Sequence, residues 1–373
     1  MSTVSSSNTA FALELFRTLS QANPAGNIFV SPLSISSALA MVYLGAKGDT
    51  AAQMAQTLFF KLNADINSPS ASYILKLANR LYGENTAHFL PVNLKAVDFI
   101  GAPEACRAEI NSWVEQQTES ENVHLPQPEQ QGIILASSIK DLLKPGTVNA
   151  DTRLALVNAV YFKGNWMNTF DEENTEEMPF KVKQNETVPV QMMHQKEQLP
   201  YNYIADHDLQ ILELPYVGEE LSMFILLPKE SSDGSDPLLK ELTQERLNEW
   251  TDRKNMEVDS EVLVQLPKFK LEEDYELNEP LAKLGMKDVF CAGRADLSGM
   301  NGEGGLFLST VAHKAFVEVN EEGTEAAAAT DAVIMMQCYI PDTLFSADHP
   351  FLFFIRHNET KSILFFGRFS SPQ

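Results

Sequence analysis

The sequence predicts an α+β fold, in which helices dominate the first third of the chain and strands dominate the remainder. In the first third, apolar residues recur with helical spacing, whereas after Arg153 they form short runs that are typical of strands. Helical and strand patterns do not alternate, which argues against a parallel α/β sheet. No repeat and no flexible linker divides the 373 residues, so we expect a single domain over residues 1–373.

The helices of the first third are indicated by apolar spacing and by signals at their ends. Apolar positions within residues 11–19 lie on one face of an amphipathic helix. Residues 34–44 follow a proline and stop at a glycine, which are common helix boundaries. We expect a shorter helix at residues 50–58, opened by a threonine that suits the N-cap. Residues 71–81 fit either a strand or a helix.

The strands after Arg153 are short and apolar, and several of them end at a proline. Residues 154–162 carry an almost uninterrupted apolar run, which predicts a strand buried on both faces. Further strands are expected at residues 209–214, 221–227, 262–266, 351–355 and 362–366. The first two of these are expected to form a hairpin that turns at Gly218, and helical patterns return near residues 242–250 and 277–284.

The charge of the chain argues against several classes of partner. The chain has 28 Lys and Arg residues against 51 Asp and Glu residues, a net charge of −23. Excess negative charge opposes binding to nucleic acid and to anionic membrane surfaces. No apolar run approaches the ~18 residues of a membrane-spanning helix, and no signal-peptide pattern opens the sequence. We expect a cytoplasmic protein, with a nuclear location or release without a signal peptide as alternatives.

The sequence contains no catalytic or metal-binding motif. The GxSxG, GxxxxGK[ST] and HExxH patterns are absent, and no GxGxxG follows a strand. The three cysteines are far apart and odd in number, which indicates a free thiol in a reducing compartment. His313 lies in an apolar run, so we interpret it as a hydrogen-bonded core residue and not as a catalytic base. We therefore expect no enzymatic activity, no metal ion and no cofactor.

One segment near the C-terminus, residues 317–341, suits two conformations. Its alanines favour a helix, whereas Gly323 interrupts the start and the β-branched residues favour extended backbone. With the period of a strand, small or apolar residues share one face: Thr324, Ala326, Ala328, Thr330, Ala332 and Ile334. A segment that suits both an exposed loop and a strand with one buried face is typical of a conformational switch.

Motifs spread over most of the chain carry a family resemblance. They are NIFVSPLSISSALAMVYLG (27–45), LVNAVYFKGNW (156–166), LELPY (212–216), PKFKLE (267–272), EVNEEGTEAAAAT (318–330) and the C-terminal SADHPFLFFIRHNETKSILFFGRF. These motifs resemble those of the serpins, in particular the intracellular ovalbumin-type clade. The resemblance implies helices around three β-sheets and an exposed reactive-centre loop at about residues 320–341.

The resemblance also implies a suicide-substrate inhibitor of serine proteases. A protease cleaves the loop and forms an acyl-enzyme, and the freed hinge then inserts into the large sheet as a strand and traps the enzyme. The implied partner is a serine protease with an elastase-like or chymotrypsin-like pocket, held in a covalent 1:1 complex by a monomeric inhibitor. A non-inhibitory serpin that acts as an interaction or storage protein is the alternative.

The resemblance assigns roles to individual residues. By the loop register of the family, the reactive bond is Gln337–Cys338, with Met336 as the alternative residue before the bond. The hinge would consist of Gly323, Thr324, Glu325, Ala326, Ala327, Ala328, Ala329 and Thr330. The shutter region beneath the opening sheet would consist of Ser34, Ser36, Asn158 and His313, for which plain core hydrogen bonding is the alternative. Asn165 and Trp166 are expected near the top of that sheet, where the hinge enters.

Three regions depart from the family pattern. Residues 58–73 and 89–97 are shorter than in typical serpins, whereas residues 120–136 look inserted. The resemblance places the inserted region beside the helix that covers the insertion gap. We expect these departures to affect the efficiency of loop insertion more than the fold.

Overall fold

The computed structural model describes residues 3–58, 73–90, 94–118, 139–230, 238–258, 260–324 and 343–372. Within these ranges the α-helices are α1 (Thr3–Ala22), α2 (Pro32–Tyr43), α3 (Gly48–Leu58), α4 (Pro103–Thr118), α5 (Gln244–Trp250), α6 (Asn278–Lys283) and α7 (Ser298–Asn301). Strands that are mostly later in sequence form three sheets, which confirms the predicted α+β class.

The main sheet positions the candidate site. Its strand order is β11 (Phe269–Glu276), β12 (Leu308–Val319), β4 (Leu154–Asn165), β2 (Tyr73–Glu84) and β3 (Leu94–Val97). The short strand β13 (Gly323–Thr324) also pairs with β4. Strands β4 and β12 run parallel to each other, whereas β2 and β4 are antiparallel.

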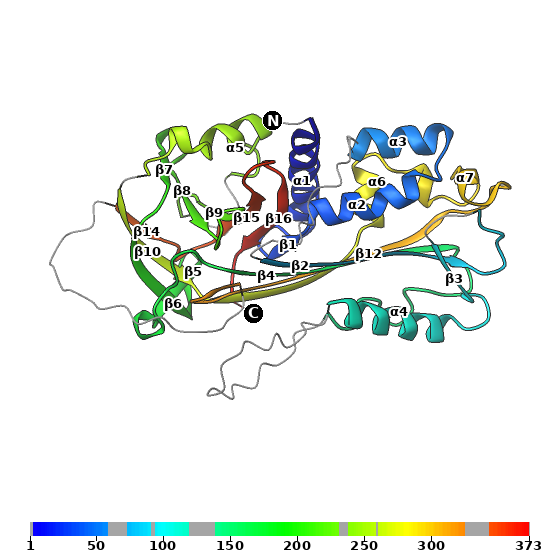
Figure 1. Ribbon diagram of the computed structural model, residues 1–373, viewed down its shortest axis with the longest axis horizontal. Coiled ribbons are helices and arrows are strands. Elements are labelled where there is room, and N and C mark those ends of the chain that lie inside the picture. Colours follow the sequence, from blue (N-terminus) through cyan, green and yellow to red (C-terminus); the bar gives the residue numbers. More distant parts are fainter. Residues whose placement is uncertain are drawn as a thin grey trace.

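The other two sheets lie beside the main sheet (Figure 1). The C-terminal sheet has the order β1 (Ile28–Val30), β16 (Ile363–Phe369), β15 (Phe351–His357), β9 (Leu221–Leu227), β8 (Leu209–Pro215) and β7 (Tyr201–Ile204). The small sheet has the order β14 (Thr343–Ser346), β10 (Glu261–Pro267), β6 (Glu186–Gln198) and β5 (Glu176–Lys183).

Strand β4 is buried on both faces, as its apolar run predicts. Leu154 and Leu156 belong to the core formed with α1, α2 and α3, whereas Ala155 and Val157 belong to the core under α4. Figure 1 shows the same arrangement, with α2 and α3 on one side of the main sheet and α4 on the other. Because successive side chains of a strand point to opposite faces, covering both faces requires apolar residues at nearly every position.

Two local expectations are settled by long-range contacts. The ambiguous residues 71–81 lie largely within β2, whose described part pairs with β4 from Tyr73–Gly164 to Gly83–Leu154. The expectation that Thr50 caps its helix is wrong, because α3 begins at Gly48. The Thr50 hydroxyl instead accepts a hydrogen bond from the backbone N–H of Asp296 at 3.0 Å.

Candidate functional site at the top of the main sheet

The described part of the expected hinge, Gly323 and Thr324, begins just beyond the ladder between the central strands β4 and β12. The ladder between β4 and β12 ends at the pair Tyr161–Phe316. Beyond β12 the chain turns at Asn320, whose side-chain oxygen accepts the backbone N–H of Gly323 at 3.2 Å. After the turn, Gly323 and Thr324 pair antiparallel with Asn165 and Gly164 of β4.

Gly323 is required by the close approach of the hinge to β4. Its φ of +144° lies in a region that residues with a side chain rarely adopt. A Cβ atom at this position would lie 2.3 Å from the carbonyl oxygen of Gly164 and 2.7 Å from the Cα of Asn165. Both atoms belong to the backbone, so a change of side-chain rotamer cannot relieve these contacts. Glycine is therefore the residue that allows the hinge to pair here.

Trp166 holds the turn that precedes the hinge. Its indole Nε1 donates to the carbonyl oxygen of Asn320 at 3.0 Å, and its backbone N–H donates to the carbonyl oxygen of Glu322 at 2.8 Å. The indole is buried and stacks on Tyr216 with a centroid distance of 4.6 Å. The structure thus brings Trp166 and Asn165 together with the first two hinge residues.

Glu321 is a buried carboxylate in the same turn. Lys268 Nζ lies 2.7 Å from its Oε2, and the Thr175 hydroxyl donates to its Oε1 at 2.9 Å. Burial raises the pKa of the Glu321 carboxyl, but the hydrogen bonds from Lys268, its own backbone and Thr175 outweigh burial and leave the pKa below its ordinary value. The turn before the hinge is therefore tied to the start of β11 by an ion pair.

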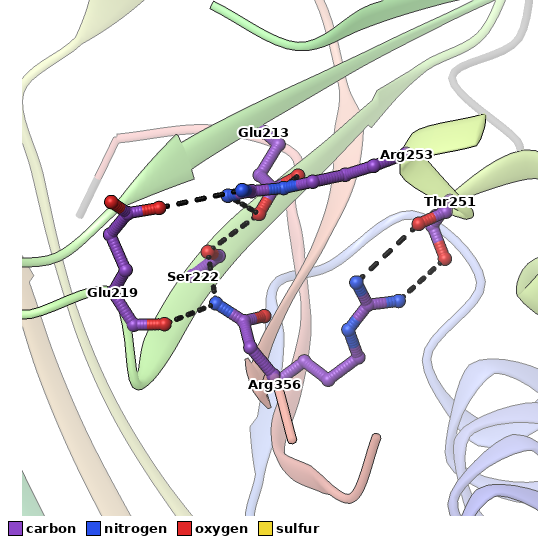
Figure 2. Close-up of polar contacts among 7 residues, drawn as sticks. Glu213, Glu219, Ser222, Thr251, Arg253 and Arg356 are labelled. Atoms are coloured by element: carbon purple, nitrogen blue, oxygen red, sulfur yellow. Dashed lines mark hydrogen bonds and ion pairs between the residues drawn. The ribbon is translucent and has the colours of Figure 1, made fainter. Parts of the chain in front are cut away.

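A polar cluster fixes the hairpin that carries Tyr216 (Figure 2). Glu213 of β8 is fully buried and accepts hydrogen bonds from Arg253 Nε at 3.0 Å and Nη2 at 2.9 Å. The Ser222 hydroxyl of β9 also donates to Glu213, at 2.7 Å, and receives a hydrogen bond from Asn358 Nδ2 at 2.8 Å. These contacts join both strands of the hairpin, so Tyr216 at its turn is held against Trp166.

Further down the main sheet, a hydrogen-bonded network crosses the junction between β12, β4 and β2. His313 lies opposite Asn158, which lies opposite Asn79. Asn158 Nδ2 donates to the Ser34 hydroxyl of α2 at 2.5 Å and to Asn79 Oδ1, and His313 hydrogen-bonds to Asn158 Oδ1. The backbone N–H of Ser31 donates to His313 Nε2 at 3.2 Å. We call these five residues the shutter network.

The shutter network fixes the tautomer and charge of His313. Because Nε2 accepts the Ser31 N–H, the proton of the neutral ring is on Nδ1, which donates to Asn158. The ring is fully buried, and burial lowers the pKa of His313 to about 3. His313 is therefore a neutral core residue in the folded protein, as the sequence indicated.

The structure brings some of the expected shutter residues together and leaves one apart. Ser34, Asn158 and His313 share the network, whereas the buried Ser36 hydroxyl has no hydrogen-bond partner in the described part of the chain. Sequence reasoning missed Ser31, Asn79, Lys268 and Glu321. Lys268 and Glu321 lie within motifs that carried the resemblance, PKFKLE and EVNEEG, and this was the available signal.

Several expected site residues lie outside the described ranges. These are the hinge residues Glu325, Ala326, Ala327, Ala328, Ala329 and Thr330, and the reactive-bond residues Met336, Gln337 and Cys338. The region at 120–136 also lies outside them. Within the part of the chain that the structure describes, no cluster of His, Cys, Asp and Glu could hold a metal ion. No described helix is long and apolar enough to span a membrane.

The family model and the fold indicate the same protein family. The chain belongs to the serpins, the serine protease inhibitors, whose family model matches residues 6–372. It is 51% identical to the leukocyte elastase inhibitors of Equus caballus and Homo sapiens, and each alignment covers 100% of both chains. Among solved structures, uncleaved ovalbumin is 35% identical with a TM-score of 0.84, covering 99% of this chain and 100% of ovalbumin.

Proposed function

We propose that this chain is a suicide-substrate inhibitor of serine proteases with elastase-like or chymotrypsin-like pockets. One observation carries the proposal: the first two residues of the expected hinge pair antiparallel with β4 just beyond the end of its parallel ladder with β12. The name of the leukocyte elastase inhibitors supports the choice of protease class.

The proposed reaction begins as ordinary proteolysis. The serine hydroxyl of the protease attacks the carbonyl carbon of Gln337, the bond to Cys338 breaks, and the amine of Cys338 leaves with a proton. Residue 337 is then joined to the protease as an ester, which water would normally hydrolyse. Each inhibitor molecule is consumed by one protease, so we propose a 1:1 covalent complex and no catalytic turnover. Cleavage after Met336 would follow the same course.

Cleavage frees the hinge to continue as a strand between β4 and β12. A strand that continues from β13 is antiparallel to both neighbours, so one parallel ladder is replaced by two antiparallel ladders. Antiparallel pairing is slightly more stable, and each added backbone hydrogen bond contributes about 0.5–1.5 kcal/mol. Insertion of residues 324–337 at ~3.3 Å per residue carries the attached protease about 45 Å.

Two sets of contacts would hold the sheet closed until cleavage. The Trp166 and Glu321 contacts fix the turn before the hinge, and the shutter network joins β12 to β4 below it. Insertion separates β12 from β4, so the hydrogen bond between His313 and Asn158 must break or be re-formed around the new strand. We propose that these residues, with Gly323 and Thr324, control when insertion occurs.

The remaining properties follow from composition. We propose a monomeric, single-domain inhibitor that works in the cytoplasm, because three widely spaced cysteines provide no evident disulfide framework. The nucleus, or release without a signal peptide, would also suit this composition.

Complex formation tests the proposed function. The purified chain is mixed with an elastase-like or a chymotrypsin-like protease, and the products are separated under denaturing conditions. We expect an SDS-resistant complex and a released C-terminal peptide. The mass of this peptide should correspond to a start at Cys338 or at Gln337. Cleaved chain together with fully active protease would refute the proposal.

A further inference from the structure

The end of β4 is hydrogen-bonded on both of its edges, and we call residues 164–167 the tip of β4. On one edge, the N–H of Trp166 donates to the carbonyl oxygen of Glu322 at 2.8 Å, in the turn before the hinge. On the other edge, the N–H of Met167 donates to the carbonyl oxygen of Pro215 at 2.9 Å. Neighbouring residues of an extended backbone direct their N–H groups to opposite edges. The hinge and the hairpin between β8 and β9 therefore lie on opposite sides of the tip.

The hairpin and the hinge meet at Asn165. Its carbonyl oxygen accepts the N–H of Val217 from the hairpin at 2.8 Å, and on its other edge Asn165 pairs with Gly323. Tyr216 forms a backbone bridge with Trp166 and stacks on its indole, with a centroid distance of 4.6 Å. The position of the hairpin therefore sets the position of the β4 residue on which the first hinge pair is formed.

Glu213 is a fully buried carboxylate on the first strand of this hairpin. Figure 2 shows that Arg253 joins it to Glu219 in the hairpin turn, and that Ser222 joins it to the second strand. Burial lowers the pKa of Arg356 to about 10, and the charge of Glu213 opposes this effect. The carboxylate therefore acts on two cations, and removing its charge leaves both less compensated.

We propose that Glu213 is a positioning residue for insertion of the hinge: through Arg253 and Ser222 it fixes the hairpin that holds the tip of β4, and it thereby increases the rate of insertion. This inference deepens the proposed function and rests on it. Glu213 lies in the C-terminal sheet, so it acts through β4 and not on the reacting atoms. A fixed tip preserves the first hinge pairs, and these set the register of the pairs that follow.

Hydrogen exchange of the intact chain tests the positioning role without any protease. Glu213→Gln keeps the size of the side chain and removes its charge, which weakens the hydrogen bonds from Arg253 and Ser222. We expect the amide protons of Met167 and Trp166 to exchange at least about tenfold faster than in wild type. Unchanged exchange of both amides would overturn the proposal.

Glu84→Gln is the matched control for the hydrogen-exchange experiment. Glu84 is also fully buried and accepts the backbone N–H of Phe99 at 2.8 Å, but it lies at the end of β2 that is far from the tip of β4. We expect exchange at Met167 and Trp166 to change by less than about twofold in this variant. Equal acceleration by Glu213→Gln and Glu84→Gln would show a general loss of stability and would overturn the proposal.

Protease kinetics test the effect on insertion. At saturating inhibitor, protease activity is lost with a limiting rate constant that includes insertion. We expect this constant to be about tenfold lower in Glu213→Gln and unchanged in Glu84→Gln, although both variants lower the melting temperature. Rate constants that fall in parallel with the melting temperature in both variants would show a merely structural role and would overturn the proposal.

Ser222→Ala keeps the test decisive if Glu213→Gln does not fold. The substitution removes one donor to Glu213 with little change in volume. We expect a limiting rate constant about threefold lower than wild type, and an unchanged constant would overturn the proposal. A wild-type chain that traps no protease would refute the proposed function and the effect on insertion, whereas hydrogen exchange would still decide whether Glu213 fixes the tip of β4.

Discussion

His313 and Asn158 face each other across the ladder between β12 and β4, and His313 Nδ1 donates a hydrogen bond to Asn158 Oδ1. The two side chains join the strands that would separate in the proposed insertion of the hinge. Asn158 extends the connection to Ser34 on α2 and Asn79 on β2. One neutral imidazole therefore contributes to the closure of the main sheet.

Acid should weaken the folded protein through His313. Burial lowers the pKa of His313 in the folded protein to about 3, whereas an exposed histidine in the unfolded chain keeps its ordinary value of about 6.5. Between these values the unfolded chain binds a proton that the folded protein does not. Stability therefore falls with decreasing pH, by up to about 1.4 kcal/mol per pH unit. Urea unfolding measures the free energy of unfolding between pH 6.5 and 4.5. Its slope against pH should be shallower in His313→Gln than in wild type, by the equivalent of about one proton. Equal slopes in the two proteins would contradict this account.

Alanine at Gly323 should disrupt the pairing of the hinge with β4. The new Cβ would clash with the backbone of Gly164, so we expect a loss of about 2–3 kcal/mol in the free energy of unfolding. Gly146→Ala is the matched control, because Gly146 has a positive φ of +84° but nothing within 4 Å of an added Cβ. Chemical unfolding measures both variants. A loss no larger at Gly323 than at Gly146 would show that the contact with β4 does not matter.

The ion pair between Glu321 and Lys268 should couple more strongly than an exposed pair. Glu321 is almost fully buried, so removing Lys268 leaves a buried carboxylate poorly compensated. A double-mutant cycle with Glu321→Gln and Lys268→Met should give a coupling free energy of about 1–2 kcal/mol. The same cycle on the exposed pair Glu279–Lys283 should give about 0.3–0.5 kcal/mol. Similar values for the two pairs would contradict a structural role for Glu321.

Strand alternation predicts opposite effects for two neighbouring hinge substitutions. By the period of a strand, Thr324 belongs to the small and apolar face of the expected hinge, whereas Glu325 belongs to the opposite face, which we propose stays exposed after insertion. Thr324→Arg should prevent insertion and convert the inhibitor into a substrate, while Glu325→Arg should still form the covalent complex. The ratio of complex to cleaved chain on a denaturing gel measures this. Equal ratios for the two variants would argue against insertion in this register.

The parts of the fold that the sequence predicted are those in which local pattern and burial agree. Strand β4 was predicted correctly because both of its faces are covered, which requires a continuous apolar run. Residues 71–81 stayed ambiguous because LKLANRL suits a helix as well as a strand. Pairing of β2 with β4, which is a long-range interaction, stabilises the strand conformation of these residues.

The polar contacts of the site were less predictable. Lys268 and Glu321 are far apart in sequence, and neither residue carries a local sign that the other will lie 2.7 Å away. Arg356 follows an apolar run in β15, yet it is buried over Phe224 and donates to Thr251 Oγ1 at 2.7 Å. Burial lowers the pKa of Arg356 to about 10. Such pairings depend on which elements meet. The reactive bond at Gln337–Cys338 stays a prediction.

The pairing of Gly323 with Asn165 has a consequence for timing. A strand that slips by one residue exchanges the side chains on its two faces, so an incoming segment would ordinarily have to search for its alignment. Here the pairs Gly323–Asn165 and Thr324–Gly164 are already formed, so in the proposed insertion they would set the register of the residues that follow. In the proposed mechanism, the competition between hydrolysis of the ester and insertion of the strand would therefore depend on how fast β4 and β12 separate.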